Sequence, residues 1–179
     1  MTTVINRYKL IKEGRTLREQ RESVEKDVWN FIRTIYLFLF RHVKGFPQLS
    51  ENLGHQLCDK RKWKEYYETN EDKNLTEEQH QKILAALVLM TSQEKRYYII
   101  AFNYYELFTI EDDLTFLYNI TLAIIHELLH YYEKITGNKT PIHASAKPSK
   151  FEMELVSRFM QEHFGCLKSE LSKYCWSHQ

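Results

Sequence analysis

The stretch "IIHELLHYYE", residues 124–133, places a glutamate directly after one histidine and a second histidine four residues after the first. On a helix, residues i and i+4 project from the same face, one turn apart. His126 and His130 can therefore offer imidazole nitrogens to a single metal ion. Glu127 can reach a water molecule on that metal without being a ligand itself, which is the position that a general base needs. The pattern predicts a zinc-binding catalytic helix.

The residues around this motif are uncharged, which predicts that the helix is buried. Both positions between Glu127 and His130 are leucine, and the flanks are isoleucine and tyrosine. Two imidazoles and a carboxylate buried in such surroundings are costly without a compensating partner. A metal ion would provide one. The alternative is a pair of core histidines satisfied by hydrogen bonds.

Length and composition predict one ordered, helix-rich domain. The chain has 179 residues, enough to bury a substantial core, and only 5 glycines and 3 prolines. With 25 basic and 24 acidic residues, its charge favours neither nucleic acid nor an anionic membrane as a partner. The most apolar stretches, residues 29–40 and 116–125, are too short or too interrupted to span a bilayer.

The expected compartment is the cytoplasm. The first 25 residues lack the apolar segment of a signal peptide. Cys58, Cys166 and Cys175 are an odd number of cysteines without a CxxC pair, which is typical of a reducing environment rather than of a disulfide framework.

Hydrophobic periodicity predicts helices over residues 17–43, 75–90, 113–136 and 151–164, with a shorter one near 167–175. Residues 96–108 are β-branched and aromatic without a helical period, which indicates a strand. Residues 46–70 read as irregular, with 62–68 as either helix or strand. The expected fold class is α+β, as a single domain over 1–179. Residues 1–45 form an N-terminal helical extension, and its long helix packs on 113–136.

"HELLH" in an uncharged helix, reached from an aromatic strand, resembles the zincin metallopeptidases over residues 96–164. The resemblance implies a zincin-like fold with a small sheet, an active-site helix and a following helix that bears a ligand. It also implies that "RYYIIAFNY", residues 96–104, is the edge strand that pairs with an extended peptide substrate. The first 90 residues have no recognisable counterpart in that group.

A catalytic zinc needs three protein ligands and an open position. The metzincin register is "HELLHYYEKIT" here and lacks a third histidine, so that class is excluded. A SprT-like arrangement would use a histidine from a following loop, and His143 is the candidate. A gluzincin arrangement would use a glutamate on the following helix, either Glu152 or Glu154.

Helical spacing favours Glu152 as the third ligand. It lies near the centre of a broad apolar face, whereas Glu154 lies on the opposite side. That face is formed by Phe151, Leu155, Val156, Phe159, Met160 and Phe164. Gluzincins also carry an aspartate four residues after the ligand glutamate, where this chain has Val156. Another acceptor must therefore orient the zinc-bound histidine.

The resulting hypothesis is zinc-dependent hydrolysis of peptide bonds in a peptide or protein substrate. His126, His130 and Glu152 bind Zn²⁺, and Glu127 is the general base. Tyr132, His143 and His163 are candidates to stabilise the developing oxyanion. One alternative is a catalytically silent zinc-binding scaffold that acts as a sensor or protein-interaction module. Another is a helical interaction protein with a fortuitous motif and an aromatic surface over 29–40 and 97–108.

Overall fold

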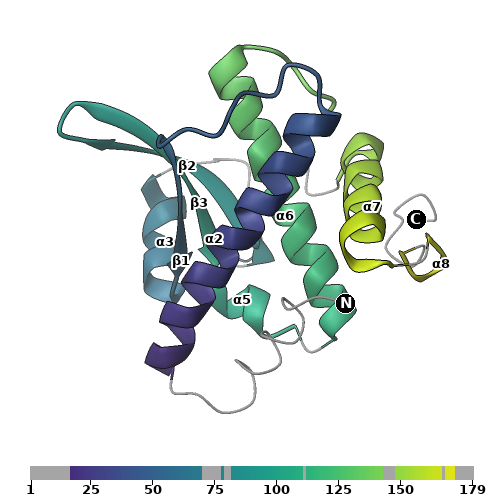
Figure 1. Cartoon of the computed structure of the whole chain (residues 1–179). Coiled ribbons are helices and arrows are strands. Elements are labelled where there is room, and N and C mark those ends of the chain that lie inside the picture. The colour runs from purple at the N-terminus through teal and green to yellow at the C-terminus, as the bar shows by residue number, and fades with distance from the viewer. Residues whose placement is uncertain are drawn as a thin grey trace.

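The computed structural model describes residues 17–69, 78, 82–110, 112–142, 148–166 and 168–171. Over these residues the chain is an α+β fold with six helices and one three-stranded sheet. In chain order the elements are α2 (Leu17–His42), β1 (Leu53–Cys58), α3 (Lys60–Thr69), β2 (Ala85–Ser92), β3 (Lys95–Asn103), α5 (Tyr104–Phe108), α6 (Asp113–Thr136), α7 (Lys150–Phe164) and α8 (Lys168–Leu171). The helices α2 and α6 lie on one face of the sheet and α3 on the other (Figure 1).

The sheet has the order β1-β3-β2, so β3 is its central strand. It runs parallel to β1 and antiparallel to β2. Because side chains alternate across a strand, Ile100 and Phe102 point into the large core with α2 and α6. Ile99 and Ala101 point the other way, into a smaller cluster that includes Trp63 of α3. The expectation that 96–104 is an edge strand is therefore wrong.

The predicted helix over 75–90 is also wrong for its second half, which is strand β2. The run "AALVLM" at 85–90 is continuously apolar, and a short apolar run does not distinguish a helix from a buried strand. The link to β3 is a two-residue turn at Gln93 and Glu94, with φ values of 49° and 67°. Positive φ at both positions matches the right-handed twist of a hairpin, although glycine or asparagine is the usual signal for it.

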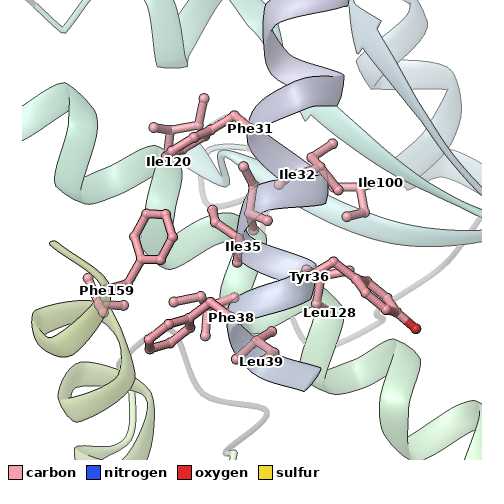
Figure 2. Close-up of a cluster of buried hydrophobic side chains, with 14 of the residues drawn as sticks. Phe31, Ile32, Ile35, Tyr36, Phe38, Leu39, Ile100, Ile120, Leu128 and Phe159 are labelled. Carbon is pink, nitrogen blue, oxygen red and sulfur yellow. The ribbon is translucent and has the colours of Figure 1, made fainter. Parts of the chain in front are cut away.

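The long N-terminal helix is part of the main core, as the sequence predicted. Ile32, Ile35 and Leu39 of α2 are fully buried and share one hydrophobic cluster with Ile120 and Leu128 of α6 (Figure 2). Most large side chains of residues 29–40 are buried in this cluster, so the expected aromatic surface over this stretch is wrong. Only Leu37 and Phe40 are exposed among its large hydrophobic residues.

Local capping fixes the ends of the two helices that matter for the site. The Asp112 carboxylate accepts a hydrogen bond from the Thr115 N–H at 2.7 Å, and α6 ends at Gly137 with φ 74°. Ser149 caps α7, which ends at Gly165 with φ 63°. The predicted helices over 113–136 and 151–164 are confirmed. None of the helices in the described part of the chain has the length and apolarity needed to cross a membrane.

Candidate metal centre

Helix α6 carries the motif between the sheet and α7. Ile125, Leu128 and Leu129 are fully buried, which confirms that the motif lies on a core helix. The side chains of His126 and His130 keep 27% and 34% of their surface exposed. The two imidazoles therefore lie at the border of the core, where an ion from solvent can reach them.

The two imidazole rings face each other through the same type of nitrogen. His126 Nε2 and His130 Nε2 are 3.0 Å apart, and the ring planes are nearly perpendicular at 85°. The outer nitrogen of each ring faces a carboxylate. His126 Nδ1 contacts Glu152 Oε1, and His130 Nδ1 lies 3.8 Å from Glu133 Oε1. The four side chains form a continuous row with a carboxylate at each end.

This row changes the proton affinity of both rings. Burial alone would lower the pKa of His126, but the hydrogen bond with Glu152 and the neighbouring carboxylates raise it above its ordinary value. Burial and the charge of His126 lower the pKa of His130. The pair therefore favours one cationic ring beside one neutral ring.

Glu152 is fully buried, as the helical spacing predicted, and its partner is a ring nitrogen of His126. Its Oε2 atom accepts a hydrogen bond from the Ser149 N–H at 2.6 Å, and Ser149 Oγ accepts one from the Glu152 N–H at 3.2 Å. These two bonds form a capping box at the start of α7. Burial raises the pKa of Glu152, but the hydrogen bonds from His126 and Ser149 outweigh it and hold that pKa below its ordinary value.

Glu127 is 7% exposed and points from α6 towards strand β2. Its carboxylate accepts a hydrogen bond from the backbone N–H of Leu87, which tends to lower its pKa, as does His126. Burial is the larger effect and raises the pKa of Glu127 to about 7.

The imidazole pair fits two ligands of one zinc ion. Two Zn–N bonds of 2.0–2.1 Å at a near-tetrahedral angle place the nitrogens roughly 3.3 Å apart, and the observed separation is 3.0 Å. Glu152 contacts the nitrogen of His126 that points away from this pair, while Glu154 is exposed. His143 lies outside the described residues. Among those described, no group of three His, Cys, Asp or Glu side chains is arranged to hold a metal ion.

The structure does not bring Tyr132 or His163 to the imidazole pair. The Tyr132 hydroxyl donates to the Lys44 carbonyl at 3.2 Å, and its ring stacks on Phe46. Tyr132 is two residues past His130, so it projects from nearly the opposite side of α6. His163 lies about three turns along α7 from Glu152, roughly 16 Å at 1.5 Å per residue. Neither residue is placed to stabilise an oxyanion beside His126 and His130.

We expect His163→Phe to preserve any hydrolytic activity and to raise stability by roughly 1 kcal/mol. His163 stacks on Phe159, and its Nε2 atom is buried without a hydrogen-bond partner in the described part of the chain. Burial and Arg41 lower the pKa of His163 against the opposing effect of Glu162. Because the unfolded state then binds the proton more readily, wild-type stability falls as pH drops below about 6.5. Thermal melts at pH 8 and pH 5 should show a gain that grows at the lower pH, and an activity loss would restore His163 to the site.

Two residues that support this site, Glu133 and Ser149, were not predicted from the sequence, although each has a sequence signal. Glu133 is three residues after His130, a spacing that places the two side chains on one helix face. Ser149 and Glu152 have the spacing of a capping box. By contrast, the contact of Glu127 with Leu87 depends on the strand pairing of β2 and has no local signal.

No family model, no curated protein and no solved structure matches this chain. The geometry of α6, α7 and β2 is therefore the basis for a proposal of function.

Proposed function

We propose that the protein is a zinc-dependent hydrolase of peptide bonds, with His126 and His130 as metal ligands and Glu127 as the general base. The observation that carries the proposal is the pair of Nε2 atoms that face each other at 3.0 Å, each ring having a carboxylate at its other nitrogen.

The Glu152 carboxylate favours one tautomer of His126 through a hydrogen bond, and the Glu133 carboxylate, 3.8 Å from His130 Nδ1, favours the same tautomer of His130 through its charge alone. An ionised carboxylate only accepts hydrogen bonds, so the nitrogen facing it carries the proton. With the protons on both Nδ1 atoms, both Nε2 atoms present lone pairs to each other. Two lone pairs at this separation repel, so the pair needs either a proton on one Nε2 atom, which then donates to the other, or a metal cation beside both. A proton can fill this role in the metal-free protein, and a zinc ion suits the same pair of nitrogens.

A zinc ion bound at these nitrogens would polarise the scissile carbonyl and lower the pKa of an attacking water molecule. Glu127 follows His126 on α6 and is held by the Leu87 N–H, so its carboxylate stays in a fixed position beside the pair. From there it takes the proton of the water and passes it to the leaving amine. Its burial excludes bulk water from this transfer.

The edge of β2 away from β3, where the described residues place no further strand, is the surface that we propose for an extended peptide substrate. The Asn103 N–H donates to the Leu84 carbonyl, which makes these two residues a hydrogen-bonded pair. In an antiparallel ladder such pairs alternate with pairs that exchange no hydrogen bonds, and the latter here include Ala85, Leu87 and Leu89. The main-chain groups of Ala85, Leu87 and Leu89 then point away from β3. The Leu87 N–H already donates to Glu127, so an added peptide would pair with Ala85 and Leu89. An extended peptide can add to such an edge, and here Glu127 contacts it.

The first test is zinc content after dialysis. We expect about one zinc per chain in the wild type and a loss of most of it in His130→Ala, since one of the two described nitrogen ligands is removed. The matched control is Glu154→Ala, because that side chain is exposed on the far side of α7 and should leave zinc content unchanged. A wild-type protein without stoichiometric zinc would overturn the proposal.

The second candidate function is a metal-binding scaffold without turnover. It is favoured because only two metal-ligating nitrogens converge among the described residues. Release of fragments from an unfolded protein substrate separates the two functions. A zinc-loaded wild-type protein that releases no more fragments than the Glu127→Gln variant at the same concentration is a scaffold.

A further inference from the structure

The structure assigns to Glu152 the role of a positioning residue that fixes the tautomer of His126, rather than that of a metal ligand. This inference rests on the proposed function, since it concerns the same imidazole pair. It also connects the start of α7 to the metal centre through one side chain.

Both carboxylate oxygens of Glu152 already have donors. Oε1 contacts His126 Nδ1, and Oε2 accepts the Ser149 N–H at 2.6 Å. The contacted nitrogen is on the side of the ring away from His130, whose Nε2 atom lies at the other nitrogen of His126. Glu152 is also fully buried, so it cannot exchange these donors for water. The carboxylate therefore contacts the His126 ring at Nδ1, on the side away from the nitrogen that would bind the metal.

This contact decides where the single proton of a neutral imidazole resides. A carboxylate accepts but does not donate, so the His126 proton stays on Nδ1 and the Nε2 lone pair remains available to a metal. If the proton moved to Nε2, it would occupy the metal-binding position. Outer partners of this kind typically change metal affinity by 10- to 100-fold when they are removed. Glu152 thus fills the orienting role for which the sequence offered no aspartate.

The second ring has a weaker version of the same support. Glu133 Oε1 is 3.8 Å from His130 Nδ1, and its Oε2 accepts the Thr140 N–H at 2.7 Å. Glu133 keeps 17% of its side chain exposed, whereas Glu152 keeps none. We therefore expect zinc affinity to depend more strongly on Glu152 than on Glu133.

The decisive variant is Glu152→Gln. A glutamine also completes a capping box, so the start of α7 is retained. However, an amide has one acceptor oxygen and one donor nitrogen. When the oxygen accepts the Ser149 N–H, the amide NH₂ faces His126 Nδ1 and favours the tautomer with the proton on Nε2. The expected results are a change of the His126 tautomer and a 10- to 100-fold loss of zinc affinity.

The measurements are ¹⁵N NMR of the imidazoles in the metal-free full-length protein at pH 9, and zinc affinity by competition with a chelator. Ser149→Ala is the matched control, because it breaks the cap but keeps the carboxylate and the backbone N–H that it accepts. It should destabilise the protein by about 1 kcal/mol and leave both the tautomer and the zinc affinity unchanged.

The outcomes separate this inference from the proposed function. A wild-type His126 protonated on Nδ1 supports the inference even if zinc does not bind, in which case only the proposed function fails. A wild-type His126 protonated on Nε2 overturns the inference whatever the zinc affinity. Loss of zinc in Glu152→Gln with an unchanged tautomer also overturns it, because that result identifies Glu152 as a ligand. Unchanged affinity and tautomer overturn it as well.

Discussion

Glu127→Gln is expected to reduce peptide hydrolysis by at least roughly 10²- to 10⁴-fold, the usual contribution of a general base, while zinc content stays near that of the wild type. The amide oxygen of glutamine can still accept the Leu87 N–H, so the contact between α6 and β2 is preserved. What the variant lacks is a group that takes a proton from water. The rate of fragment release and the zinc content are measured on the same preparation.

The matched control is Glu154→Gln, the same chemical change at an exposed position of α7. It should leave both the rate and the zinc content unchanged. A Glu127→Gln protein that hydrolyses peptides at the wild-type rate would show that Glu127 is not the base. Loss of zinc in that variant would show that Glu127 holds the metal site together rather than moving a proton.

The parts of the site that lie on one helix could be predicted from the sequence. The spacing of His126, Glu127 and His130 is a local property of α6, and its limits at Asp113 and Thr136 agree with the predicted helix. The burial of Glu152 could also be predicted, because it follows from the apolar periodicity of α7. Local periodicity is a reliable guide where one helix determines the placement.

The parts that depend on contacts between distant segments could not be predicted. The two ring nitrogens of His126 are equivalent in the sequence, and only the docking of α7 on α6 decides that Glu152 meets Nδ1. The order of the strands is likewise a long-range property. Strand β1 lies in a stretch without an alternating pattern, so its pairing with β3, which makes β3 central, was not visible. The prediction of 96–104 as an edge strand was therefore wrong.

Ile35→Ala combined with Phe38→Ala is expected to unfold the protein and release any bound zinc. Both side chains of α2 are fully buried, and the Phe38 ring lies edge-on to Phe159 of α7 at 5.3 Å between centroids (Figure 2). Truncations of this kind cost roughly 2–5 kcal/mol each, against a total stability of about 5–15 kcal/mol for a typical protein. Leu128, which lies between Glu127 and His130, is buried in the same cluster, so a loss of packing at α2 would extend to the proposed metal ligands.

The control for this variant is Leu37→Ala, which removes a side chain of the same helix that is 56% exposed. It should change the free energy of unfolding by less than about 0.5 kcal/mol. Urea unfolding and zinc content together provide the measurement. If the double variant unfolded like the wild type, α2 would be an appendage to a core that stands without it. If instead it loses structure and zinc together, α2 is a structural component of the proposed metal centre, because its buried side chains share one core with Leu128 of α6.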